Sequence, residues 1–76
     1  MAGSAIKRVD RHVAGRIRHR RKQLGITQSE IAAFIGVSPQ QMQKYESGRD
    51  RITAGYLFAV AMILEVSVAY FYEGVR

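Results

Sequence analysis

The stretch Gln28–Ser47, QSEIAAFIGVSPQQMQKYES, decides the fold. Its apolar residues recur at the three- and four-residue spacing of helices on both sides of a turn. Two small residues, Ala32 and Gly36, stand where crossing helices leave little room. The pattern therefore predicts two short helices joined by a tight turn. The positions expected to face inward are Ile31, Phe34, Ile35, Val37, Met42 and Tyr45.

Both helices carry signals for their first residues. Thr27 can accept a hydrogen bond at the start of the first helix, and Glu30 can reach back to it, which makes a capping box. Ser38 and Gln41 repeat this arrangement before the second helix. The second helix is therefore expected over about residues 39–47. The glycines expected to stop helices are Gly25, Gly36 and Gly48.

A longer helix is expected before this pair, over about residues 10–23. Val13 and Ile17 share an apolar stripe that continues to Arg21 and Leu24. A charged residue on such a stripe needs a partner, because an unpaired buried charge is expensive.

Two further helices are expected after the pair, over residues 54–64 and 68–73, capped by Thr53 and Ser67. Residues 1–9 show no periodicity and are predicted to form a flexible arm. The sequence thus predicts an all-α, compact five-helix domain over residues 10–76.

The charge of this chain is uneven. Its formal net charge is +6 and its pI is about 10.3. Residues 1–22 hold most of the excess, with Asp10 as the lone acidic residue. Such a basic run favours a polyanionic partner over the alternative of an ordinary solvated helix face. The cations of this run are Lys7, Arg8, Arg11, Arg16, Arg18, Arg20, Arg21 and Lys22.

Other features narrow the class of protein. The chain has no cysteine, and His12 and His19 are its only histidines, so neither a metal nor another cofactor is expected. The apolar stretch 54–64 is shorter than the roughly 18 residues that a membrane span requires. No targeting signal precedes the basic run, and a cytoplasmic protein is expected.

The residues resemble the Cro/CI-type (XRE-type) helix-turn-helix repressors of bacteria and phages. The resemblance covers roughly residues 15–74. It implies a lambda-repressor-like DNA-binding domain that regulates transcription, usually as a homodimer on a near-palindromic operator. The matching residues are Gly15–Arg18, Arg21, Leu24–Gln28, Ile31–Ala32, Ile35–Ser38, Tyr45–Gly48, Leu57, Ala61, Leu64 and Val66.

The helix over residues 39–47 would then enter the major groove. Glutamine can make two hydrogen bonds to adenine, and lysine can donate to guanine. Gln40 and Lys44 match base-reading positions of the family, and Gln41 and Gln43 are further candidates for base contact. Relatives often carry a base-reading side chain where this chain has Pro39, so their operators do not transfer to it.

The resemblance also implies contacts to phosphate. Gln28 begins a helix whose free backbone N–H groups favour the same anion. Ser47, Arg49 and Arg51 occupy a loop that follows the sugar-phosphate backbone in relatives. Arg18 and Arg21 are further candidates. Relatives pair the positions of Arg21 and Glu46, so these two are expected to form a structural ion pair.

The C-terminal third has more apolar residues than its core needs. Leu57, Val60, Ala61 and Leu64 form one stripe of the helix over 54–64, which leaves a second apolar pair on the same helix. A contiguous exposed apolar patch usually marks an interface. We expect a homodimer, with a toxin as the alternative partner. The expected interface residues are Phe58, Met62, Val68, Tyr70 and Tyr72.

Several functions compete with a DNA-binding regulator. An enzyme is disfavoured, because the sequence offers no paired carboxylates, Ser/His/Asp group or glycine-rich phosphate loop. RNA binding is disfavoured, because no aromatic residue alternates with the exposed cations. A protein-interaction module that has lost DNA binding is disfavoured by Arg49 and Arg51. An antitoxin that also represses its operon remains an alternative, because fold analogy does not separate it from a regulator.

Overall fold

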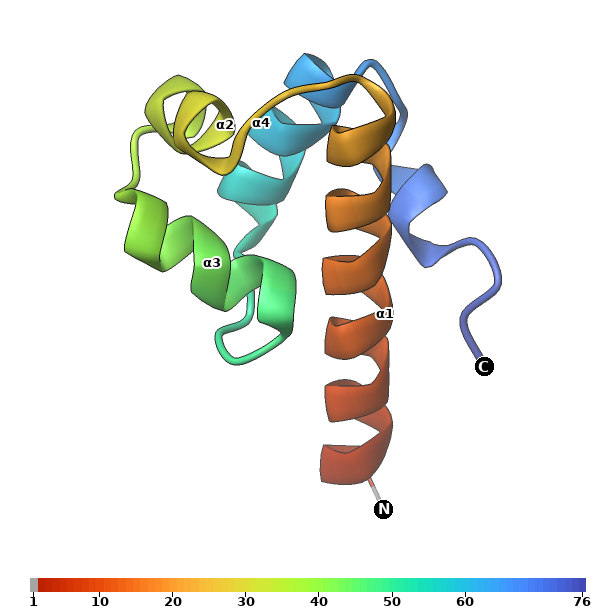
Figure 1. Cartoon of the computed structure of the whole chain (residues 1–76). Coiled ribbons are helices and arrows are strands. Elements are labelled where there is room, and N and C mark those ends of the chain that lie inside the picture. Colours follow the sequence, from red (N-terminus) through yellow and green to blue (C-terminus); the bar gives the residue numbers. More distant parts are fainter. Residues whose placement is uncertain (1) are drawn as a thin grey trace.

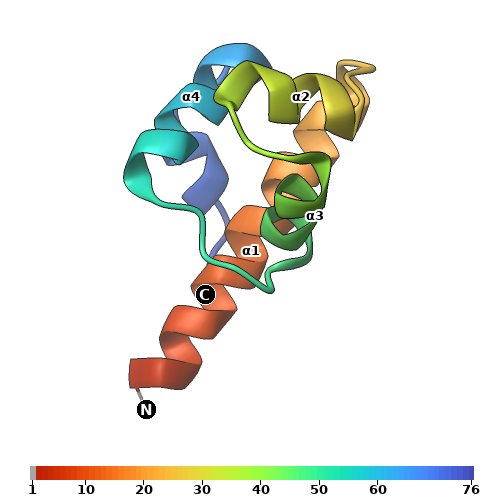
Figure 2. The ribbon, with the colours of Figure 1, turned by 90° about the vertical axis from the view of Figure 1, so that its left-hand side faces the viewer.

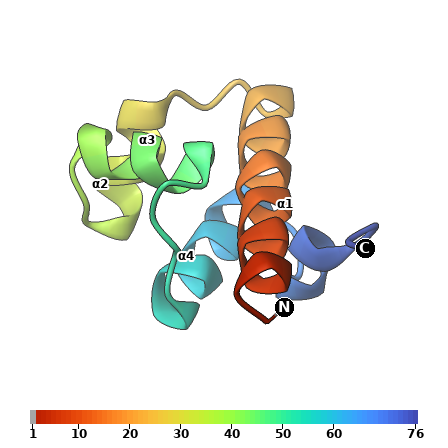
Figure 3. The same ribbon diagram turned by 90° about the horizontal axis from the view of Figure 1, so that it is seen from below.

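The computed structural model describes residues 2–76, with Ala2 described by its backbone alone. It is all-helical over these residues, and Figure 1 shows α1 standing between α3 and the C-terminal segment. In the view from below, α3 and this segment again lie on opposite sides of α1 (Figure 3). The elements are α1 (Ala2–Gln23), α2 (Gln28–Ile35), α3 (Pro39–Ser47), α4 (Ala54–Leu64) and a 3₁₀ helix, η1 (Val68–Tyr72).

Every element contributes to a single core. The side chains of Ile17 from α1, Ile31 from α2, Met42 from α3, Leu64 from α4 and Phe71 from η1 are fully buried. The core thus holds α2 and α3 against α1. Among residues 2–76, no helix combines the length and apolarity that crossing a bilayer would demand.

Phe34 is an error in the predicted core. Its side chain is 54% exposed, and Ala32 is buried in its place. The helix α2 has eight residues, and successive residues are rotated by about 100° around its axis. Because the core takes up the stripe of Ile31 and Ile35, Phe34 is turned away from it.

The first helix begins earlier than the sequence predicted. α1 starts at Ala2 rather than near Asp10, so residues 2–9 form helical turns instead of an arm; Met1, also assigned to that arm, lies outside the described residues. Tertiary contacts support these turns: Val9 packs against the core, and the Arg8 guanidinium donates to the carbonyl of Arg76. Figure 2 shows the first turns projecting beyond the other helices.

The last element also differs from the prediction. η1 is a 3₁₀ helix and not a fifth α-helix, with the backbone N–H of Tyr70 donating to the carbonyl of Ser67 at 3.1 Å. Short pieces of this length commonly adopt the tighter 3₁₀ geometry. Ser67 and Thr53 precede their helices as expected, but neither side chain makes a capping hydrogen bond.

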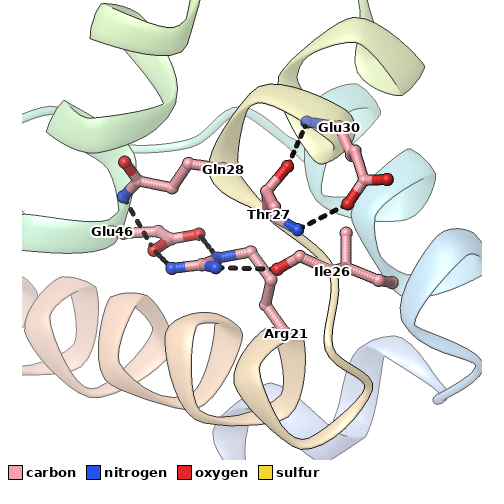
Figure 4. Close-up of polar contacts among 6 residues, drawn as sticks. All are labelled: Arg21, Ile26, Thr27, Gln28, Glu30 and Glu46. Carbon is pink, nitrogen blue, oxygen red and sulfur yellow. Dashed lines mark hydrogen bonds and ion pairs between the residues drawn. The ribbon is translucent and has the colours of Figure 1, made fainter.

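The capping box of α2 forms in full (Figure 4). Glu30 N–H donates to Thr27 Oγ1 at 3.0 Å, and Thr27 N–H donates to Glu30 Oε1 at 2.8 Å. The Thr27 backbone N–H, with help from its hydroxyl, lowers the pKa of the Glu30 carboxyl. The box at α3 is half formed: Ser38 Oγ accepts from Gln41 N–H at 3.0 Å without a reciprocal bond.

Candidate nucleic-acid interface

The outer face of α3 presents a set of polar side chains to solvent. Met42 and Tyr45 are buried on the inner face and fix the rotation of the helix. Within residues 2–76, no hydrogen bond engages the side chains of Gln40, Gln43 or Lys44. The side chains that line a shallow hollow on this face are Gln40, Gln43, Lys44, Ser47 and Arg49. This face can therefore donate hydrogen bonds to an external partner.

Gln41 lies apart from that group. Its amide Nε2 donates to Asp50 Oδ2 at 3.0 Å, and its side chain is half-buried. The structure therefore uses Gln41 to hold the α3–α4 loop in place, although the sequence offered it as a base or phosphate contact.

Arg21 and Glu46 form a buried ion pair between α1 and α3 (Figure 4). Arg21 Nε lies 2.7 Å from Glu46 Oε2, and Nη2 lies 2.9 Å from Oε1. Arg21 Nη1 also donates to the carbonyl of Ile26 at 2.8 Å. With Arg21 only 8% exposed and Glu46 6% exposed, this bidentate pair is internal to the fold. The guanidinium is thereby turned away from the phosphate role considered for it.

Gln28 joins α2 to the same network. Its amide Nε2 donates to Glu46 Oε1 at 3.0 Å. Its half-buried side chain lines a hollow with Arg18, Gln43 and Ser47, where α1, α2 and α3 meet. Gln28 thus sets the position of α3 while standing at the surface that α3 presents.

The basic residues of α1 divide into two stripes. One stripe, which we call the clasp, consists of Arg8, His12, Arg16 and Arg20. Each of its members hydrogen-bonds a backbone carbonyl of the C-terminal segment. The acceptors are the carbonyls of Arg76, Glu73 (2.6 Å), Tyr70 (3.1 Å) and Leu64 (3.0 Å), in the same order.

Arg16 makes the most contacts in the clasp. Its Nη2 lies 3.2 Å from Glu73 Oε1, and its guanidinium carbon lies 4.0 Å from the centroid of the Tyr70 ring. The sequence analysis assigned all these cations to a polyanionic partner and missed the clasp. Its signal was the regular four-residue spacing along one face of a helix.

The second stripe of α1, the open stripe, lies toward α3. It consists of Lys7, Arg11, Arg18 and Lys22. At about 100° per residue these positions fall within roughly a 60° arc, a third of a turn or more from the centre of the clasp. All of them are exposed, and none has a hydrogen bond or ion pair within residues 2–76.

The α3–α4 loop carries the remaining cations. Arg49 is exposed, and the Nε of Arg51 lies 3.0 Å from Asp10 Oδ2. Ser47 precedes them, with its hydroxyl donating to the carbonyl of Lys44 at 3.1 Å. The open stripe and this loop therefore flank the exposed face of α3 with positive charge.

The apolar residues expected at a dimer interface do not share one environment. Phe58 and Met62 on α4 are 60% and 59% exposed, and Tyr72 is also exposed. Val68 and Tyr70 are half-buried, because they pack against the core. Tyr70 is further held by Arg16 and by edge contact with Phe71.

Known proteins share both the sequence and the fold. A family described as Helix-turn-helix matches residues 17–71. A transcriptional regulator in the ATPase CF(0) region of Rhodospirillum rubrum is 49% identical over 68 residues, which is 90% of this chain and 63% of that protein. An HTH-type transcriptional regulator of Sinorhizobium medicae is 43% identical over 86% of this chain and 47% of its own. The chain thus spans about half to two thirds of these relatives.

Two solved structures superimpose on the fold. The clp gene regulator ClgR from Corynebacterium glutamicum gives a TM-score of 0.80 at 28% identity, covering 83% of this chain and 67% of that one. The P22 c2 repressor, solved with a synthetic operator, gives 0.74 at 31% identity, covering 82% of this chain and 94% of that one. The lambda-repressor-like fold class is thereby confirmed, with four α-helices and η1 in place of five α-helices.

Proposed function

Since this chain belongs to the helix-turn-helix family, we propose that it binds double-stranded DNA sequence-specifically and regulates transcription as a repressor. The observation that carries the proposal is the exposed face of α3, whose polar side chains have no partner within residues 2–76 and are flanked by cations. The proposal places the protein in the cytoplasm, with DNA.

In the proposed complex, α3 lies in the major groove. Gln40 and Lys44 read base edges, because their amide and ammonium groups are free to donate, and Gln43 stands beside them. Gln41 supports the loop instead, because Asp50 holds its amide.

Phosphate contacts come from the two sides of α3. Arg18 and the outer edge of Gln28 stand on one side, and Ser47, Arg49 and Arg51 stand on the other. Arg21 acts on the position of α3 through Glu46 and does not itself bind phosphate. Since phosphate contacts release counterions, affinity should fall steeply with salt concentration.

We further propose that the protein acts as a homodimer. Two or three base contacts worth roughly 1–3 kcal/mol each give about 2–9 kcal/mol of discrimination. Finding one site among about a million needs roughly 8 kcal/mol. One monomer is marginal by this measure, and two α3 helices about 34–36 Å apart, reading half-sites one helical turn apart, are sufficient.

The comparisons give the antitoxin alternative no support, since the relatives above are named as transcriptional regulators. The P22 c2 repressor, solved with its operator, lends weight to a repressor role.

Selection of bound sequences from random duplex DNA by the purified chain tests the proposal. We expect enrichment of a near-palindromic site whose half-site centres are about 10 base pairs apart. The same selection at two salt concentrations should return the same site with weaker retention at higher salt. Recovery of no enriched sequence at either salt concentration would refute sequence-specific binding.

A further inference from the structure

We propose that a cleft between the N-terminal half of α1 and the α3–α4 loop binds a DNA backbone phosphate that lies outside the base pairs read by α3. The inference rests on the proposed function, because it assigns an additional contact to the same duplex. The charged residues that line this cleft are Lys7, Arg11, Arg49 and Arg51, with Asp10 as the acidic member.

Close packing at Gly48 fixes the cleft. Gly48 ends α3 with φ of 77°, and a Cβ built there would lie 3.2 Å from Cγ of Arg11. The last turn of α3 therefore rests directly on α1, which sets Arg11 beside the end of the helix proposed to read bases. Lys7 lies one helical turn farther out, on the part of α1 that projects beyond the other helices (Figure 2).

The charges of the cleft favour an anion. Lys7, Arg11 and Arg49 have no ion-pair partner within residues 2–76, whereas Arg51 pairs with Asp10 at 3.0 Å. Four cations against one carboxylate leave a local excess of three positive charges. A bound phosphate reduces the repulsion among them, and Asp10 keeps Arg51 at the edge of the cleft before DNA arrives.

The cleft is continuous with the exposed face of α3. Ser47 and Arg49 line both the cleft and the hollow that contains Gln40 and Lys44. A DNA strand that lies against α3 can therefore continue into the cleft without leaving the protein surface. This continuity favours a backbone phosphate of the same duplex over a free anion.

Adjacent residues of α1 provide a matched test. Lys7→Gln and Arg11→Gln remove charge from the cleft, whereas Arg8→Gln removes the same charge from the next position, which faces the C-terminal segment. With the selected operator as probe, we expect each cleft variant to reduce the log–log salt slope by about 0.9, the value for one lost phosphate contact. Arg8→Gln should leave the slope unchanged.

Duplex length gives a second readout. Shortening the probe to the two half-sites should weaken binding of the parent chain and have a smaller effect on a Lys7→Gln/Arg11→Gln double variant, which has already lost the outer contact. Thermal unfolding should show equal midpoints for the parent and the double variant, because both side chains are exposed.

The outcomes separate the two proposals. A parent chain that selects no duplex would overturn the proposed function and this inference with it. A parent that binds while Lys7→Gln and Arg11→Gln match Arg8→Gln would overturn the inference alone. Saturable binding of inorganic phosphate without DNA, lost in the double variant, would identify a free-anion site and overturn the assignment to DNA.

Discussion

Arg21 and Lys22 are neighbours in the sequence and have opposite environments in the fold. Arg21 is buried against Glu46, and Lys22 belongs to the open stripe. The sequence predicted the buried pair, because a charge on an apolar stripe requires a partner. It did not separate the clasp from the open stripe, because the acceptors of the clasp are backbone carbonyls and leave no trace in residue identity. Only the fold brings those carbonyls beside α1.

Replacement of Glu46 tests the buried pair. Glu46→Ala should destabilise the chain by about 3–5 kcal/mol, because it leaves the Arg21 guanidinium buried without its counter-charge. Urea denaturation measures this change. Glu73→Ala is the matched control: it removes the exposed partner of Arg16, for which about 0–1 kcal/mol is expected. Equal midpoints for the two variants would show that burial adds nothing to the Arg21 pair.

Substitutions on α3 and in the loop should separate base reading from phosphate binding. Gln40→Ala and Lys44→Ala should each cost roughly 1–3 kcal/mol and relax preference at one base pair of each half-site. Arg51→Ala should weaken binding to all duplexes about equally. Binding titrations against the operator and its single-base variants measure both effects. If Lys44→Ala weakened all duplexes equally, Lys44 would be a phosphate contact.

At the scale of elements, local signals predicted the interior of the chain well. α2, α3 and α4 begin where capping residues and proline indicated, and α2 and α3 end at Gly36 and Gly48 with positive φ. The ends of the chain were predicted less well. The start of α1 and the 3₁₀ geometry of η1 depend on contacts between segments far apart in sequence, and local periodicity carries no information on such contacts. Phe34 failed for a related reason, since the neighbours of α2 decide which of its faces is buried.

The capping box of α2 should contribute measurable stability. Thr27→Ala should destabilise the chain by about 0.5–2 kcal/mol, because it leaves the N–H of Glu30 without its acceptor. Thr53→Ala is the matched control, because Thr53 holds the same position before α4 without a side-chain hydrogen bond. Equal losses in the two variants would mean that the box adds nothing beyond the threonine backbone.

The box also has a defined pH dependence. The pKa of the Glu30 carboxyl is lowered in the folded chain, so its contribution is present above the ordinary pKa of glutamate and is lost as the pH falls through the lowered value. Urea midpoints of the parent and of Glu30→Gln, measured across that range, should converge toward acid. A constant difference between the two midpoints would contradict this linkage.

At the scale of the whole molecule, charge and apolar surface lie on different elements. The open stripe, the loop cations and the outer face of α3 form one polar surface, whereas Phe58 and Met62 project from α4. Such a separation would allow two copies to associate through α4 while both bind the same duplex. The sequence predicted the excess of apolar residues on α4, but it could not show that Tyr70 is already held by Arg16.

Sedimentation equilibrium at micromolar concentration tests this association. The parent chain should sediment as a dimer, and Phe58→Glu and Met62→Glu should shift it toward monomer, because a charge would be buried in the interface. Phe34→Glu is the matched control, since Phe34 is a similarly exposed apolar residue on α2. A parent that is monomeric both free and on DNA would refute the homodimer.

The clasp makes the C-terminal segment sensitive to length and tolerant of composition. Its acceptors are main-chain carbonyls, which every residue type provides, so replacing exposed side chains such as Ser67 or Ala69 leaves each acceptor in place. The donors recur every four residues along a rigid helix, a repeat of about 6 Å. Inserting or deleting one residue after Leu64 would move the later carbonyls out of step with this repeat. Variation in this segment should therefore consist of substitutions at constant spacing, with insertions and deletions excluded.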